Sequence, residues 1–262
     1  MLIAMPEKEL STMQTAAMWS ITPRLAEARA EAEAFALGGI IRLWERRLGE
    51  HYSGVLNVPC GLGRHDDALR KQGFNVSGVD LNPDFIRLAQ KAHPQWSYHY
   101  KVGDMRKLPF AKEACPAFDI VINLFTSIGY NGKAGDVMTL AEFRRVLKKG
   151  GLLIIETHNR EPFKERLRQS FIDEPIEGFV RIVRHEVKDE VWTLHNTLLR
   201  KEKNGNLTKV GTKDTPVVLY SPEELSSICR RAEFEVLAIY GGYTINPIKP
   251  SDVNMMLVAR KK

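Results

Sequence analysis

The sequence predicts an α/β fold: a doubly wound, seven-stranded, mostly parallel sheet. Short β-rich runs alternate with helical runs across residues 52–157, as in parallel strands joined by right-handed crossovers. The alternation returns at 221–240. The last β-rich run, 253–260, follows a turn with Pro and Asn and not a helix. We therefore expect it to run antiparallel to its predecessor.

The elements follow in order along the chain. The first β-rich run, 54–58, leads through a glycine-rich turn into a helical run at 63–73. The second, 74–80, precedes a helix that Asn82 can cap, with Pro83 at its first position. We expect the remaining elements of the alternation to be strands at 98–104, 118–125 and 152–157 and a helix at 136–151.

The C-terminal part repeats this pattern. Ser221 and Glu224 have the spacing of a capping box. Apolar residues follow at helical spacing, and a β-rich run covers 235–240. One more helix and two strands complete the predicted sheet.

Two regions lie outside the alternation. Residues 1–50 contain an amphipathic run rich in Ala and Glu, which predicts an N-terminal helical cover before a main domain at 51–262. Residues at about 176–220 predict an antiparallel β insertion with a turn at 202–206. Such an insertion has exposed edge strands, so we expect a homodimer.

Composition limits the class of protein. The chain has 262 residues, of which 44% are hydrophobic and 27% charged, as in ordinary globular domains. The formal net charge is +6, but Lys and Arg are interleaved with acids. Together with the absence of an aromatic and basic motif, this makes nucleic acid an unlikely partner.

The cysteines and histidines show no ligand pattern. Cys60, Cys115 and Cys229 form no paired spacing, which favours a reducing compartment, the cytoplasm, and argues against a zinc site. The histidines also lack ligand spacing, so no metal is expected. No signal peptide or long apolar run is present, so no membrane association is expected.

The turn after the first strand predicts a ligand site. Gly61 and Gly63 remove side chains where a strand turns into a helix, so a ligand can approach the backbone. Asp80 ends the second strand, where a carboxylate can accept hydrogen bonds from ribose hydroxyls. Asp104 ends the third, where it can accept from an adenine amino group, with the Met105 N–H on a ring nitrogen. Since open α/β sheets bind ligands at these strand ends, we expect an adenosine-containing ligand.

NAD is the rival ligand. Its G-x-G-x-x-G fingerprint needs a third glycine, where this sequence has Asp66, and no second mononucleotide-binding half is present. The pattern argues against NAD.

At these residues the chain resembles the class I S-adenosylmethionine-dependent methyltransferases, over 54–157 and from 220 to the C-terminus. The antiparallel last strand fits this family. The segment NLFTSIGY (123–130) is most similar to small-molecule enzymes such as the sugar N-methyltransferases, and the loop resembles that of a microbial group with CGxGRH. The resemblance implies S-adenosylmethionine as cofactor and a small-molecule acceptor.

The resemblance also implies roles for individual residues. The glycine-rich loop holds the methionine part of the cofactor, Asp80 the ribose and Asp104 the adenine. Arg64 is a candidate partner of the methionine carboxylate. The predicted cofactor-binding residues are Cys60, Gly61, Gly63, Arg64, Asp80, Leu81, Asp104, Met105, Leu124 and Phe125.

Two positions depart from the family. Asn57 stands where the first strand usually has an acid, and Pro59 where the loop has its first glycine. Asn57 removes a negative charge that would indirectly face the ligand's ammonium group, so either affinity is lower or another acid substitutes. Pro59 removes a donor but still lets Cys60 and Gly61 present backbone groups.

Methyl transfer needs chiefly alignment of two atoms. Tyr130 and Phe125 are placed to face a sulfonium, although Phe125 suits the core equally well. His158, directly after the fifth strand, is the candidate base or substrate contact. An RNA or protein methyltransferase and a non-catalytic cofactor-binding protein remain alternatives.

Overall fold

The structure is a computed structural model that describes residues 23–111 and 117–262. Among them, two compact units are distinguished. The smaller holds residues 23–29 and 167–216, and the larger holds the remainder. The larger unit contains the predicted sheet.

The sheet of the larger unit has seven strands in the order β10-β11-β5-β4-β1-β2-β3. Neighbours from β3 to β5 pair in parallel, whereas β11 is antiparallel to both β5 and β10. The predicted α/β fold with an antiparallel last strand is confirmed. The strands are β1 (Gly54–Asn57), β2 (Asn75–Asp80), β3 (Tyr100–Val102), β4 (Phe118–Asn123), β5 (Leu147–His158), β10 (Phe234–Tyr240) and β11 (Asn254–Lys261).

Two of the helices between the strands begin where the sequence predicts caps. The Asn82 side chain accepts a hydrogen bond from the Asp84 N–H at 2.9 Å, and the capping box of Ser221 and Glu224 is formed. These elements are α3 (Asp66–Lys71), α4 (Pro83–Ala92), the 3-10 helix η1 (Pro94–His99), α5 (Gly132–Val146), α6 (Arg160–Arg166) and α7 (Pro222–Arg231).

The helix predicted at 136–151 has different ends. It begins at Gly132 and stops at Val146, and the basic segment that follows opens β5. The reason is that Leu147 is fully buried and pairs with Phe118 of β4, while Lys148 bonds Asp119 at 2.7 Å. Tertiary pairing overrides the local helical pattern here.

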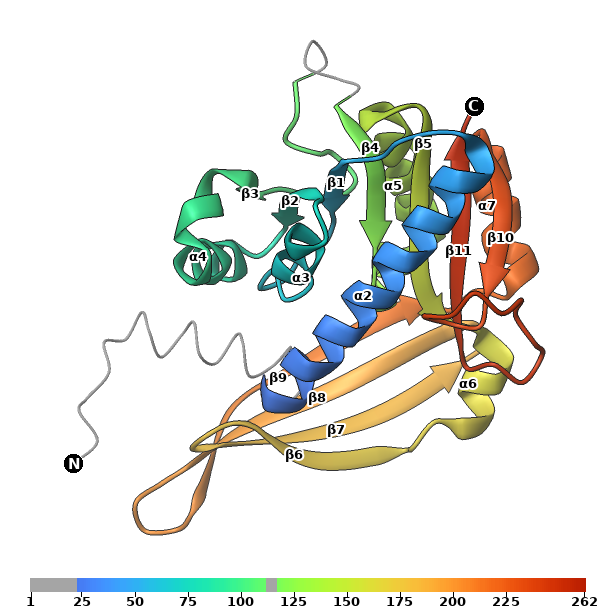
Figure 1. The fold of residues 1–262 in the computed structure, drawn as a ribbon. Coiled ribbons are helices and arrows are strands. Elements are labelled where there is room, and N and C mark those ends of the chain that lie inside the picture. The colour runs from blue at the N-terminus through green and yellow to red at the C-terminus, as the bar shows by residue number, and fades with distance from the viewer. Residues whose placement is uncertain (1–22, 112–116) are drawn as a thin grey trace. The chain divides into compact units, whose positions relative to one another are not determined.

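A long helix, α2 (Pro23–Leu48), precedes the first strand. From Ala30 on it belongs to the larger unit. Leu37, Ile41 and Trp44 are buried in one core cluster with strand residues such as Ile120 and Ile154. Figure 1 shows α2 crossing one face of the sheet with α5 behind the opposite face. The helix is thus part of the sheet's own core.

The smaller unit contains an antiparallel sheet in the order β6-β7-β8-β9. Its strands are β6 (Ser170–Ile176), β7 (Phe179–Lys188), β8 (Val191–Lys201) and β9 (Leu207–Val218), of which the last two residues fall in the larger unit. The turn predicted at 202–206 is closed by a hydrogen bond from the Glu202 N–H to the Asn206 carbonyl at 2.8 Å.

Candidate functional site

The parallel strands bring the predicted residues to one edge. Asn57 of β1 pairs with Gly78 and Ile122, and Asp80 of β2 pairs with Val102. Because parallel strands end at the same edge, the residues after β1 to β5 line one side of the sheet. These residues are the glycine loop, Asp80, Asp104, the segment from Leu124 to Tyr130, and His158.

The glycine loop adopts the predicted conformation. Gly61 and Gly63 have φ angles of 56° and 76°, which favour glycine. A Cβ on Gly63 would lie 2.6 Å from the Tyr100 hydroxyl oxygen, so only glycine fits. The Cys60 N–H, however, donates to the Val79 carbonyl at 2.9 Å. This bond holds the loop against β2, so the Cys60 N–H is already used within the protein.

Asp80 is a buried acceptor held by backbone groups. Its side chain is 8% exposed. Its two oxygens accept from the Gly61 N–H at 2.8 Å and the Asn82 N–H at 2.9 Å. Burial raises the pKa of Asp80, and these hydrogen bonds oppose the rise. Leu81 beside it is 65% exposed, which gives the edge an apolar surface next to a fixed carboxylate.

Asp104 is held differently. Arg106 donates to both of its oxygens, at distances between 2.6 and 3.0 Å, and its backbone N–H adds a bond of 2.8 Å. The hydrogen bonds from Arg106 lower the pKa of Asp104. The Met105 sulfur lies 3.9 Å from the Asn123 side-chain nitrogen, so Met105 reaches toward β4. Asp104 can therefore contact a ligand only in competition with Arg106.

The segment after β4 has an unusual backbone. Phe125 and Thr126 have φ angles of 57° and 52°, a region that non-glycine residues rarely adopt and that occurs at functional sites. The Phe125 N–H donates to the Glu156 carboxylate at 2.7 Å, and the Thr126 N–H to its carbonyl at 3.1 Å. Leu124 is 3% exposed within the core, and its carbonyl accepts a hydrogen bond from the Ser127 hydroxyl at 2.7 Å.

Two residues at the start of α3 have partners within the protein. The Arg64 guanidinium carbon lies 3.5 Å from the Phe125 ring centroid, a cation–π contact. His65 is 3% exposed, and its Nε2 lies 3.0 Å from a Glu33 carboxylate oxygen of α2. Arg64 covers the aromatic face that was expected to lie beside a sulfonium, whereas His65 joins two helices.

Tyr130 and His158 differ in what they can do with a proton. Burial, followed by the charge of Asp80, raises the pKa of Tyr130 to about 12, although 37% of the residue is exposed. A phenol of that pKa stays protonated near neutral pH and can donate a hydrogen bond. The His158 Nδ1 lies 2.7 Å from the Asn254 side-chain oxygen, and its ring stacks on Phe163 at 4.1 Å. With that oxygen as acceptor, Nδ1 carries the proton and Nε2 keeps the lone pair of the neutral ring.

A buried acid beneath the glycine loop was not among the predicted site residues. Asp66 has no exposed surface, and its Oδ1 accepts from the Asn57 side-chain nitrogen at 2.7 Å. The sequence signal was present twice, because Asp66 replaces the third fingerprint glycine and Asn57 replaces the acid of the first strand. Only the structure shows that Asn57 and Asp66 are hydrogen-bonded to each other.

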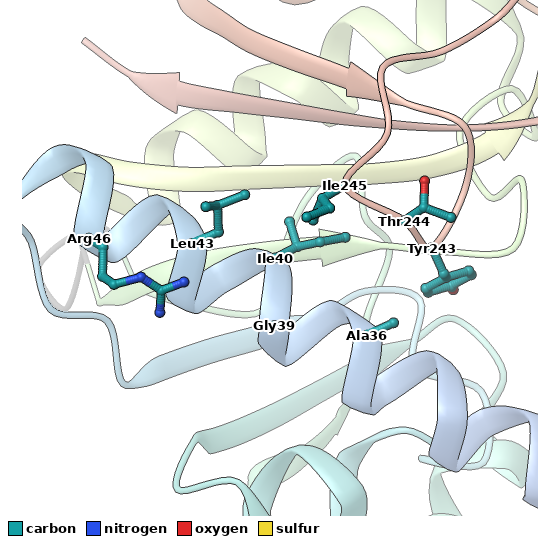
Figure 2. Close-up of a pocket in the computed structure, with 8 residues that line it drawn as sticks. All are labelled: Ala36, Gly39, Ile40, Leu43, Arg46, Tyr243, Thr244 and Ile245. Atoms are coloured by element: carbon teal, nitrogen blue, oxygen red, sulfur yellow. The ribbon is translucent and has the colours of Figure 1, made fainter.

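A separate cavity of about 280 Å³ lies between α2 and the loop after β10 (Figure 2). Its lining is apolar apart from Arg46, Thr244 and the hydroxyl of Tyr243, and it includes none of the residues predicted to bind the cofactor or to act in catalysis. Figure 2 shows Tyr243, Thr244 and Ile245 on one side and α2 on the other. The cavity is thus distinct from the residues gathered at the strand ends.

Within residues 23–111 and 117–262, no group of three or more His, Cys, Asp or Glu side chains is arranged to hold a metal ion. No helix within the same residues is long and apolar enough to cross a membrane.

The sequence comparisons point to one kind of protein. Residues 55–151 match a family described as a methyltransferase domain. A dTDP-3-amino-3,4,6-trideoxy-alpha-D-glucopyranose N,N-dimethyltransferase of Streptomyces venezuelae is 30% identical over 105 residues, which are 40% of this chain and 42% of that protein. A dTDP-4-amino-2,3,4,6-tetradeoxy-D-glucose N,N-dimethyltransferase of Saccharopolyspora spinosa is 26% identical over 215 residues, 81% of this chain and 75% of that protein. The chain spans less than half of the first relative's length.

The fold is shared with solved structures. An S-adenosylmethionine-bound amino pentose methyltransferase of Micromonospora echinaspora has a TM-score of 0.65 at 20% identity, covering 100% of this chain and 99% of that one. At this identity the likeness establishes the fold.

Proposed function

We propose that residues 55–151, which match a family described as a methyltransferase domain, act as a class I S-adenosylmethionine-dependent methyltransferase, and that the chain transfers a methyl group from S-adenosylmethionine to an amine nitrogen of a small molecule. The single observation that carries the proposal is Asp80, a buried carboxylate held beside the glycine loop at the edge where this fold binds its ligand. The two relatives described above methylate amino sugars linked to dTDP, which makes this class the first acceptor to test.

The residues present fit the cofactor. Asp80 can accept from ribose hydroxyls, and exposed Leu81 offers an apolar surface to the adenine. The buried Asn123 side-chain oxygen, at the end of β4, has no hydrogen-bond partner among the described residues, which is a property of sites that receive a ligand or water. When bound, S-adenosylmethionine supplies an electrophilic methyl group carried by a sulfonium.

The chain's own residues would then orient the acceptor and take its proton. His158 is the proposed base, with Asn254 fixing the tautomer that leaves Nε2 basic. Tyr130 is the proposed hydrogen-bond donor near Asp80. Phe125 is proposed to face the sulfonium once Arg64 moves to the methionine carboxylate. Selection of the acceptor is proposed for the N-terminal region at 1–50 and the insertion at 176–220, since such additions vary independently of cofactor chemistry.

Two further proposals concern the whole protein. A homodimer is supported by edge strand β6, where Ile172 is 68% exposed. Light scattering showing a monomer at high protein concentration would contradict the homodimer.

A cytoplasmic location is supported by Cys60 and Cys229, which are buried free thiols.

The test combines binding and turnover. S-adenosylmethionine and NAD are titrated by calorimetry, and amino sugar nucleotides are then incubated with enzyme and S-adenosylmethionine, with methylated product detected by mass spectrometry. We expect binding of S-adenosylmethionine alone and product with an amine acceptor, both lost in Asp80→Ala. Binding without turnover on any acceptor favours the non-catalytic alternative, turnover only on RNA or protein favours the macromolecular one, and absence of binding refutes the proposal.

A further inference from the structure

Asp66, the first residue of α3, carries a carboxylate in an environment that disfavours its charged form. It has no exposed surface, and burial raises its pKa. Its Oδ1 accepts from Asn57, but no group in the described part of the chain meets hydrogen-bond geometry at Oδ2. The Tyr100 hydroxyl is near enough to oppose the rise in pKa without completing that bond.

Stability does not explain this acid. The Arg70 guanidinium, whose charge lowers the pKa of Asp66, donates to the Val76 carbonyl at 2.8 Å, the Tyr100 hydroxyl at 3.2 Å and Asp67 at 3.2 Å, and not to Oδ2 of Asp66. A buried carboxylate without an ion-pair partner costs free energy. Asparagine would keep the bond with Asn57 and avoid that cost, so retention of the acid needs another reason.

The position of Asp66 supplies one. A Cβ built on Gly63 would lie 3.2 Å from the Asp66 Oδ2, so the carboxylate lies directly behind the backbone of the glycine loop. In this buried surrounding the effective dielectric constant is low, and the field of a charge extends through the loop to its other side.

We propose that Asp66 is a positioning residue that supplies negative charge behind the glycine loop and thereby favours the cationic methionine part of S-adenosylmethionine, with Asn57 holding the carboxylate in place. The inference rests on the proposed function. It identifies Asp66 as the acid that substitutes for the one missing from the first strand. Relative to the family pattern, the negative charge stands at the start of α3 and not at the end of β1, and Asn57 at the end of β1 donates a hydrogen bond to it.

Three variants test this charge. Asp66→Asn removes it with little change of shape. The double variant Asn57→Asp with Asp66→Asn returns it to the strand end with the hydrogen bond reversed. Asp67→Asn is the matched control, an acid on the same helix with its side chain 43% exposed. For each variant, calorimetry with S-adenosylmethionine and S-adenosylhomocysteine and thermal unfolding without ligand are measured.

We expect Asp66→Asn to bind S-adenosylmethionine about tenfold more weakly while unfolding at an unchanged or higher temperature. The loss is smaller for S-adenosylhomocysteine, which lacks the sulfonium charge. The double variant regains most of the affinity, and Asp67→Asn stays within about twofold of wild type. The difference in affinity between wild type and Asp66→Asn widens as pH rises through the titration of Asp66. The titratable and charged groups that interact with Asp66, which are His65, Arg70, Tyr100 and Cys60, are present in both proteins and so do not cause this difference.

Equal affinity of wild type and Asp66→Asn overturns the inference and leaves the proposed function intact. Loss of affinity that the double variant does not restore also overturns it, because the residue would then be structural. If wild type binds neither sulfur nucleoside, the proposed function itself fails, and the inference fails with it.

Discussion

The ends of β2 and β3 each carry an aspartate, and the two carboxylates are held in different ways. Asp80 is 8% exposed and accepts from backbone N–H groups of its own loop and the adjoining one. The Asp104 side chain is 28% exposed and is bound by Arg106, whose side chain is itself 41% exposed. The first carboxylate is fixed by the fold, whereas the second is held by a side chain that can leave. Two positions equivalent in the sequence pattern therefore differ in how ready they are for a ligand.

The largest expected effect is at the fixed carboxylate. Asp80→Ala removes a buried charged acceptor and leaves the Gly61 and Asn82 N–H groups without it. We expect affinity for S-adenosylmethionine to fall roughly 100-fold, measured by calorimetry. Asp84→Ala, in the first turn of α4, is the control and should change affinity little. An Asp80→Ala variant that binds like wild type would contradict the comparison, because the carboxylate fixed by the fold would then not contribute to binding.

The next largest effect is expected at Asp104, the carboxylate that is held by the side chain of Arg106. We expect Asp104→Ala to weaken cofactor binding about tenfold, and Arg106→Ala to strengthen it about threefold, because the competing guanidinium is gone. In the double variant the gain from removing Arg106 should disappear, since it acts only through Asp104. Calorimetry on all four proteins completes a double-mutant cycle. Weaker binding by Arg106→Ala would mean that Arg106 positions Asp104 and does not compete with the ligand.

A smaller effect is expected at Tyr130, whose pKa is raised to about 12 by burial and, after it, by the charge of Asp80. The phenol is protonated throughout the range of ordinary assays, so Tyr130→Phe should lower kcat about threefold without changing the shape of its pH profile. The profile is measured between about pH 6 and 9. Loss of the basic limb of the pH profile in the variant would contradict this role.

The pH profile also tests His158. If His158 is the base, His158→Gln should remove the acidic limb of the kcat profile.

The smallest effect is the pH dependence of stability, and here the two carboxylates should have opposite signs. The pKa of Asp104 is lowered in the folded state, so its contribution is present above the unfolded value of about 3.9 and lost as pH falls through the folded one. The pKa of Asp80 is raised, so its ionisation on going from about pH 4 upward disfavours the folded state. Relative to wild type, Asp80→Asn should therefore gain stability with rising pH and Asp104→Asn should lose it. Urea unfolding at several pH values compares the two, and parallel curves would show that the carboxylates are held alike.

Much of the fold was predictable because its signals are local. The alternation of strands and helices, the cap at Asn82 and the capping box at Ser221 depend on neighbours in the chain. The helix end at Val146 was not predictable, since Leu147 leaves the helix to pair with a strand almost thirty residues earlier. Packing between distant residues decided that boundary.

The candidate site, like the fold, has some features that the sequence predicts and others that depend on contacts between side chains. The order of strand ends predicts that Asp80 and Asp104 share an edge, and the parallel register confirms this. Which carboxylate would be fixed was not predictable, because Arg106 lies only two residues beyond Asp104 and nothing in the sequence says that its side chain turns back. The burial of Asp66 behind Gly63 also depends on a contact that sequence spacing does not show.

The way α2 enters the core has a consequence for exchanging parts between proteins. Leu37, Ile41 and Trp44 of this helix share a core cluster with the strands of the large sheet. A chimera that takes the region before β1 from a relative must therefore also match the apolar side chains on the sheet face beneath it. A segment that the sequence marks as an addition is bound to the sheet's core. On the proposed function, in which the insertion helps to select the acceptor, residues of the small antiparallel sheet are easier to exchange, since its strands pair with one another.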